Sequence, residues 1–199
     1  MFVDPLNPNP ETIRQAAGIL RKNGVLVVKE ACTTVAYALF NLQERENTRF
    51  QALLERLQKS GRRFLLLGGP GEELIAQQIS MMMDRPPVDL VGKTTMAEAL
   101  AFVSMCALFL SNDSGLMHVA AALNIPQVAL FGSTDPQKTA PLNKRAVIIH
   151  PEHVSCTPCF KRSCPEDLEC MKAISVDEVA TAAEQLLMEM DGGDDEKRE

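Results

Sequence analysis

The sequence predicts an α/β domain in which helices cover both faces of a parallel sheet. Short apolar runs, rich in branched and aromatic side chains and without polar alternation, recur along the chain. Such runs are typical of strands that are buried on both faces. Longer segments with apolar residues at helical spacing separate them. With 199 residues, 46% of them hydrophobic, the chain can bury a sizeable core.

The chain opens with a helix and a strand. Residues 11–22 have apolar side chains at helical spacing, and Asn23-Gly24 is a stop signal. Val25 to Val28 then reads as a strand. Residues 31–42 are compatible with a strand or a helix, and a solvated QEREN segment follows. We therefore place a domain boundary here, with an N-terminal piece over 1–46 and a Rossmann-like domain over 47–190.

Helix and strand patterns alternate regularly from Thr48 onward. The predicted helices are 48–59, 71–83, 95–105, 115–123 and 176–189. The predicted strands are 64–67, 88–91, 107–110, 127–131 and 146–149. Residues 191–199, DGGDDEKRE, are too polar to bury, and we expect a disordered charged tail.

The composition excludes several classes of function. A net charge of -6 and a pI near 5.2, without a basic stripe, argue against binding to nucleic acid. No apolar run approaches the roughly 18 residues that span a bilayer. The N-terminal MFVDPLNPNPE has neither the basic nor the apolar region of a signal peptide. These features predict a cytoplasmic protein without a transmembrane segment.

Ligands of a doubly wound sheet gather at the carboxyl ends of its strands, so the loops there are the first candidates for a site. In GGPGEE, residues 68–73, glycines permit close approach of a ligand, and Glu72 could accept hydrogen bonds from ribose hydroxyls. The alternative is an ordinary turn whose acidic residue complements a helix dipole. The next loop, residues 92–95, lacks the spacing of a P-loop. Thr94 or Thr95 caps the following helix there, or touches a phosphate.

The loop over 111–115, SNDSG, stands immediately before a predicted helix. Unpaired N–H groups and the positive end of the dipole make a helix N-terminus a site for anions, and Gly115 leaves room for a diphosphate. Asp113 and Ser114 could contact that ligand or simply cap the helix. His118 lies one turn further and could donate to a phosphate oxygen, although a lone histidine is more often structural.

Four motifs in order, GGPGEE, LVGKTTMAEALAFV, LFLSNDSGLMHVAAALNIPQVALFGSTDP and CTPCFKRSCPEDLECMKAIS, resemble the ADP-heptose:lipopolysaccharide heptosyltransferase family. The resemblance covers residues 48–190 and implies the C-terminal, donor-binding half of a GT-B glycosyltransferase. It implies transfer of heptose from ADP-heptose to the lipopolysaccharide inner core, at the inner membrane surface and without a cofactor. The implied donor-binding residues are Glu72, Thr94, Asp113, Ser114, Gly115, Leu116, Met117, His118, Thr134 and Asp135.

The family's catalytic base lies in an N-terminal half that has no counterpart in this sequence, so the catalytic residues stay unassigned. A non-catalytic nucleotide-binding module is the alternative function. Residues 2–40 resemble the opening of the threonylcarbamoyl-AMP synthase family in VDPLNPNPETIRQAAGILRKNGVLVV and, faintly, in TTVAYAL. That similarity indicates a fused or eroded remnant, or an ordinary α/β opening. Synthase activity is the least favoured function, because only one helix and one strand of that fold are present.

Cys156, Cys159, Cys164 and Cys170 form a C-x2-C-x4-C-x5-C cluster. The first pair has the spacing of zinc ligands, whereas zinc loops usually pair two C-x-x-C units. Disulfides would require an oxidising compartment. We favour a reduced structural loop that packs across the edge of the sheet, with no metal, and keep zinc as the alternative.

Overall fold

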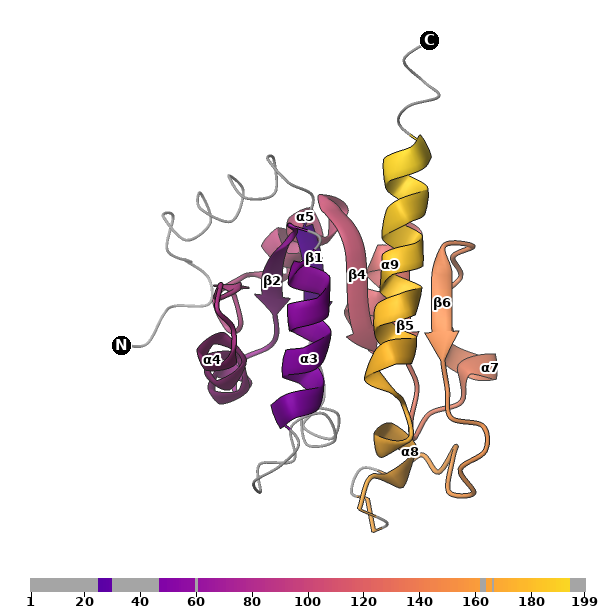
Figure 1. Cartoon of the computed structure of the whole chain (residues 1–199). Coiled ribbons are helices and arrows are strands. Elements are labelled where there is room, and N and C mark those ends of the chain that lie inside the picture. Colours follow the sequence, from indigo (N-terminus) through magenta and orange to yellow (C-terminus); the bar gives the residue numbers. More distant parts are fainter. Residues whose placement is uncertain (1–24, 30–46, 60, 162–163, 166, 194–199) are drawn as a thin grey trace.

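A six-stranded parallel sheet forms the centre of the protein (Figure 1). The computed structural model describes residues 25–29, 47–59, 61–161, 164–165 and 167–193. The strand order is β3-β2-β1-β4-β5-β6, which is the order of a Rossmann-like doubly wound sheet. The strands are β1 (Val25–Lys29), β2 (Arg63–Leu67), β3 (Val88–Asp89), β4 (Cys106–Asn112), β5 (Gln127–Leu130) and β6 (Ala146–Ile149).

The predicted helices are present, with ends that shift by a few residues. They are α3 (Asn47–Gln58), α4 (Glu73–Met82), α5 (Met96–Ser104), α6 (Gly115–Ala122) and α9 (Val176–Gly193). Two four-residue helices were not predicted, α7 (Pro136–Thr139) and α8 (Glu169–Lys172), because one helical turn is too short to show periodicity. The helix expected over 11–22 lies outside the described residues.

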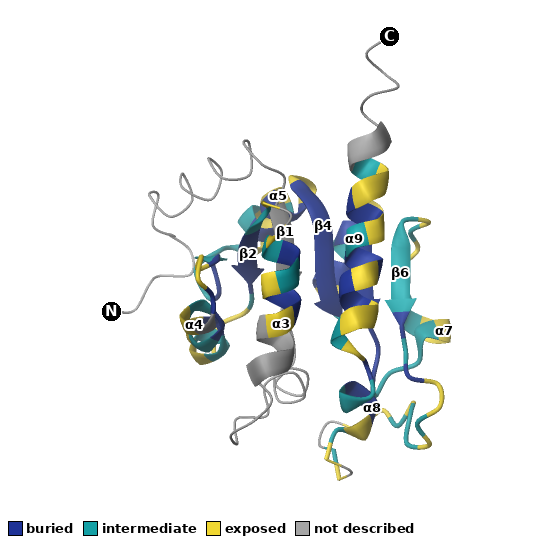
Figure 2. Ribbon diagram, viewed as in Figure 1, coloured by how far each residue is buried: buried dark blue, intermediate teal, exposed yellow. Residues whose placement is uncertain are grey.

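Side chains of the strands alternate between two buried layers. Phe64 and Leu66 of β2 pack with α3, α4 and α9, whereas Leu65 and Leu67 pack with α5 and α6. Figure 2 shows β2 and β4 buried, and α9 with buried and exposed residues in alternation along its length. The continuous apolar runs in the sequence are therefore strands covered on both sides, as predicted.

The structure differs from the expected domain boundary at residue 46. Strand β1 lies between β2 and β4, with Val27 in register with Leu65 on one side and Phe109 on the other. Residues 25–29 thus belong to the central sheet and not to a separate N-terminal piece. Sequence patterns report only local periodicity, and a strand's neighbours are set by long-range pairing. Similarly, α9 extends to Gly193, so the first three residues of the expected tail are helical.

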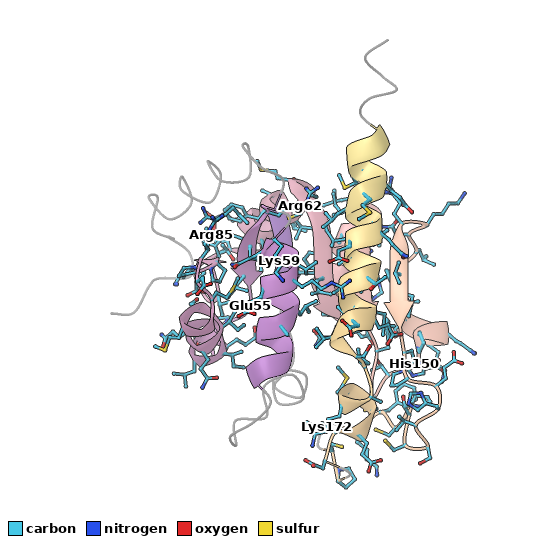
Figure 3. All side chains as sticks on the ribbon, viewed as in Figure 1. Glu55, Lys59, Arg62, Arg85, His150 and Lys172 are labelled. Carbon is cyan, nitrogen blue, oxygen red and sulfur yellow. The ribbon has the colours of Figure 1, made fainter. Side chains whose placement is uncertain are left out.

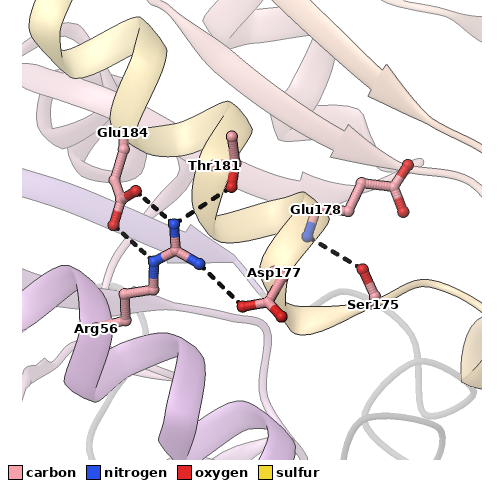
Figure 4. Close-up of polar contacts among 6 residues, drawn as sticks. All are labelled: Arg56, Ser175, Asp177, Glu178, Thr181 and Glu184. Carbon is pink, nitrogen blue, oxygen red and sulfur yellow. Dashed lines mark hydrogen bonds and ion pairs between the residues drawn. The ribbon is translucent and has the colours of Figure 1, made fainter.

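Helices α3 and α9 are joined by one arginine on their shared face (Figure 4). Arg56 donates two hydrogen bonds to the carboxylate of Glu184, at 2.8 and 2.7 Å, and one to Asp177 at 3.0 Å. These hydrogen bonds raise the pKa of Arg56, with Glu184 the largest cause. The bidentate ion pair links α9 to α3.

Candidate functional site

Because all strands are parallel, their carboxyl ends meet at one edge of the sheet. In Figure 1 this edge faces α8 and the loops around it. A cavity that is partly open to solvent lies here. Its walls come from the ends of β4 and β5 and from the cysteine-containing segment. The residues that line it are Asn112, Asp113, Leu130, Gly132, Ser133, Thr134, Cys156, Cys159, Lys161, Cys164, Pro165, Leu168, Cys170 and Met171.

Helix α6 begins beside this cavity, directly after β4. Ser114 occupies its N-cap position with an extended backbone, but its side chain makes no capping hydrogen bond. The Oγ atoms of Ser114 and of Ser111 are both buried and have no hydrogen-bond partner among the residues that the structure describes. A Cβ atom added at Gly115 would meet no atom within 4 Å. The start of α6 therefore combines open space with two hydroxyl groups that have no partner among the described residues.

Asp113 is held rigidly between the two central loops. Its N–H donates to Leu130 O at 3.2 Å, and its carboxylate accepts from Thr139 Oγ1 at 2.9 Å. The side chain is half-buried and lines the cavity. The bond from Thr139 thus orients this carboxylate at the cavity wall.

The structure separates the other expected donor-binding residues of α6. Leu116 and Met117 are 6% and 0% exposed and belong to the apolar core. Their side chains therefore pack in the core, which periodicity does not show for so short a helix, and a role for these residues in donor binding stays a prediction. Only their backbone groups lie at the site, and Met117 N–H already donates to Ser114 O at 3.1 Å. His118 is exposed on the same helix.

Thr134 and Asp135 follow β5, and both are half-buried. Thr134 lines the cavity. Asp135 instead caps α7, because its Oδ1 accepts from Gln137 N–H at 2.9 Å and its carboxylate pairs with Lys138 at 3.7 Å. The capping interaction explains this aspartate without a ligand.

Glu72 and Thr94 lie in the loops after β2 and β3. Glu72 accepts a hydrogen bond of 2.6 Å from Gly69 N–H, which folds its carboxylate over the glycine turn. Thr95, rather than Thr94, caps α5. Its Oγ1 accepts from Glu98 N–H at 3.3 Å, and Glu98 Oε2 accepts from Thr95 N–H at 2.8 Å. Thr94 is half-buried and takes no part in that capping box.

Sequence reasoning missed how the cysteine segment joins the site. The N–H groups of Cys159 and Phe160 donate to Ser133 O at 3.1 and 2.7 Å, and Thr157 Oγ1 donates to Gly132 O. The segment therefore lies over the carboxyl ends of the strands. The sequence predicted that it would lie across the edge of the sheet. Figure 3 shows the labelled His150 and Lys172 in this region, away from Glu55, Lys59, Arg62 and Arg85. No spacing rule predicts these contacts.

The position of Lys29 in the sheet was not predicted from the sequence either. It is the last residue of β1 and is in register with Ser111 of β4. The chain reverses its direction of winding between β1 and β4, and this switch point is where doubly wound sheets bind ligands.

The family model for "Glycosyltransferase family 9 (heptosyltransferase)" matches residues 44–169. A lipooligosaccharide heptosyltransferase 2 of Haemophilus ducreyi is 42% identical over 106 residues, or 50% of this chain and 30% of the relative. A lipooligosaccharide heptosyltransferase 2 of Campylobacter jejuni is 32% identical over 124 residues, or 60% of this chain and 39% of the relative. The chain thus spans about a third of the length of these relatives.

The solved structure of Escherichia coli ADP-heptose lps heptosyltransferase II superposes with a TM-score of 0.69 at 20% identity, covering 93% of this chain and 54% of that one. This likeness supports the fold. Among the helices that the structure describes, none is long and apolar enough to cross a membrane. The resemblance of residues 2–40 to a synthase falls mostly outside the described residues. The match of the family model, over more than half of the sequence, shows that the chain belongs to glycosyltransferase family 9, the heptosyltransferases.

Proposed function

We propose that this chain is the donor-binding part of a heptosyltransferase and that the start of α6 binds the diphosphate of ADP-heptose. The observation that carries the proposal is the pair of buried hydroxyl groups, Ser111 Oγ and Ser114 Oγ, which have no partner in the described part of the chain. A buried hydroxyl group without a hydrogen bond costs stability. A diphosphate, with several acceptor oxygens, is a ligand that satisfies such donors.

The energetics favour an anion at this place. Each hydrogen bond to a charged group contributes about 1.5–3 kcal/mol, and the helix dipole adds about 0.3–1 kcal/mol at an exposed N-terminus. The open space around Gly115 lets phosphate oxygens reach the backbone N–H groups. Lys161, which lines the same cavity, supplies a positive charge.

The remaining donor contacts follow from the loops around this anion site. We assign the ribose hydroxyls to Glu72, because a carboxylate oxygen accepts hydrogen bonds from hydroxyl groups. Thr94 and Thr134 supply hydroxyl groups from the neighbouring loops, and His118 supplies an exposed imidazole. Asp113 is oriented by Thr139 and faces the cavity.

The proposed reaction is transfer of heptose to a sugar of the lipopolysaccharide inner core, at the cytoplasmic face of the inner membrane. As the bond to the sugar breaks, negative charge develops on the departing ADP. Preorganised donors at the start of α6 stabilise that charge more strongly than they stabilise the bound substrate. The general base and the acceptor-binding residues are left unassigned among the described residues.

Calorimetry with ADP tests the proposal. We expect the 199-residue chain to bind ADP, and the variants Ser114→Ala and Asp113→Ala/His118→Ala to bind it at least about tenfold more weakly, a loss of about 1.4 kcal/mol. Asp84→Ala/His153→Ala is the matched control, because both residues are exposed and away from the cavity lining. An absence of ADP binding by the parent chain, with the fold intact, would overturn the proposal.

A transfer assay with ADP-heptose and a lipopolysaccharide acceptor that lacks the heptose separates two functions. Heptose transfer supports the enzyme. Binding of ADP without transfer by this chain identifies a non-catalytic nucleotide-binding module, which is the alternative function.

A further inference from the structure

Helix α7 contributes nothing to the core. It is a single turn, Pro136–Thr139, and none of its residues is buried. Asp135 caps it by accepting from Gln137 N–H at 2.9 Å. Helix propensity alone does not stabilise so short a helix. The position of α7 on the protein therefore depends on the contacts that its side chains make with other elements.

Two of these contacts lead to different walls of the cavity. Thr139 Oγ1 lies 2.9 Å from the carboxylate of Asp113, which directly follows β4. Lys138 Nζ lies 5.1 Å from the centroid of the Phe160 ring, in the cysteine-containing segment. Asp113 lines the cavity, and so do both neighbours of Phe160 in the chain. Helix α7 thus links the end of β4 to the cysteine-containing segment.

The hydroxyl group of Thr139 has two acceptors within reach and one hydrogen atom to donate. Asp113 Oδ2 lies at 2.9 Å, and Asp135 O, one helical turn back, lies at 3.3 Å. A threonine in a helix commonly bonds back to a carbonyl group of the preceding turn, so the longer contact is ordinary. The shorter contact has a charged acceptor, and such hydrogen bonds are the stronger ones. The hydrogen atom therefore goes to Asp113.

Asp113 is held at its backbone and at its side chain by two different elements. Its N–H donates to Leu130 O of β5 at 3.2 Å, and Thr139 of α7 donates to its carboxylate. A side chain that is already held in one orientation loses little freedom when a ligand binds. Thr139 is not one of the residues that line the cavity. It therefore acts on a ligand through Asp113.

The charge of Asp113 determines which part of a nucleotide sugar it contacts. A carboxylate is repelled by a diphosphate and accepts hydrogen bonds from hydroxyl groups. In the donor, the sugar is joined directly to the diphosphate, which is proposed to bind at the start of α6. Ser133 and Thr134, which also line the cavity, add two hydroxyl groups to the same wall. The sugar is thus the part of the donor that suits Asp113.

We propose that Thr139 is a positioning residue for donor specificity. By holding the carboxylate of Asp113 at the cavity wall, it makes the chain bind a nucleoside diphosphate sugar more tightly than the free nucleoside diphosphate. Free ADP offers Asp113 no sugar hydroxyl group and brings an additional negative charge, on its terminal phosphate, toward the carboxylate. Specificity then comes from attraction of one ligand and repulsion of the other. This inference rests on the proposed function, because it requires the diphosphate at the start of α6.

Calorimetry with ADP-heptose and with ADP tests the inference through the ratio of the two affinities. Thr139→Val keeps the shape of the side chain and removes the hydroxyl group, whereas Thr139→Ser keeps the hydroxyl group. We expect the preference for ADP-heptose to fall at least about fivefold in Thr139→Val and to stay within about twofold of the parent value in Thr139→Ser. Thr181→Val is the matched control and should leave the ratio unchanged, because Thr181 is exposed on α9 and away from the cavity lining.

The background Asp113→Ala separates positioning from a general effect on the fold. In that background Thr139→Val should change the ratio no further, because its effect passes through Asp113. An equal change of the ratio in both backgrounds, an unchanged ratio in Thr139→Val, or an equal loss in Thr139→Ser overturns the inference.

The parent chain gives a result that does not depend on the folding of any variant. If it binds ADP as tightly as ADP-heptose, the inference is overturned while the proposed function stands. If it binds neither ligand with its fold intact, both are overturned. Tighter binding of ADP-heptose than of ADP, lost in Thr139→Val and restored in Thr139→Ser, supports the positioning role of Thr139.

Discussion

Substitution of Gly132 by alanine tests the contact between the loop after β5 and the cysteine segment. The added Cβ would overlap Met171 Sδ and would lie 3.1 Å from Met171 Cγ. Carbon atoms pack best at roughly 3.5–4.0 Å, so the Met171 side chain must move. Met171 is 3% exposed and lines the cavity.

Overpacking of this kind costs about 1–3 kcal/mol. We expect Gly132→Ala to lower the free energy of unfolding by that amount in urea titrations, and the melting temperature by about 2–4 °C for each kcal/mol in a chain of this size. Met171→Ala alone leaves a cavity and costs about 2–5 kcal/mol.

The double variant Gly132→Ala/Met171→Ala makes the prediction specific. With the methionine side chain removed, the alanine at 132 has room, so its additional cost should fall nearly to zero. The coupling energy of the pair is then about 1–3 kcal/mol. If Gly132→Ala costs the same in both backgrounds, or costs nothing in the parent chain, the packing of the cysteine segment described above is wrong.

Three further predictions concern stability. Thr95→Ala should lower the free energy of unfolding by about 1 kcal/mol, because it removes the cap of α5. Thr94→Ala should change the same quantity, measured in urea, by less than about 0.5 kcal/mol. Equal effects of the two substitutions would contradict the capping box. Phe109→Ala should lower the free energy of unfolding by about 3–5 kcal/mol, because the side chain is completely buried. Phe160 is 54% exposed and lies beside Lys138, so Phe160→Ala should lower it by at most about 1 kcal/mol in the same titration. Burial raises the pKa of Cys106 above its ordinary value of 9.0, so the folded chain holds a proton that the unfolded chain releases. The free energy of unfolding should therefore fall as the pH rises above about 9. Urea midpoints between about pH 8 and pH 10 should fall less in Cys106→Ser than in the parent chain.

Much of the fold was predictable because its signals are local. The apolar runs at 64–67, 127–131 and 146–149 are strands, and the helices around them begin and end near their predicted residues. Parallel strands separated by helices also determine that the loops after β2, β4 and β5 share one edge, so the region of the site follows from element order alone. The position of the SNDSG loop, between β4 and α6, could be predicted for the same reason.

The rest depends on contacts between residues far apart in the chain. Pairing on both sides places β1 at the centre of the sheet, although residues 30–46 suggested a boundary. Packing buries the side chains of Leu116 and Met117, and hydrogen bonds to Gly132 and Ser133 bring the cysteine segment to the cavity. Periodicity and spacing determine which elements form, because they act over a few residues. Tertiary packing alone decides which faces are buried and which loops meet.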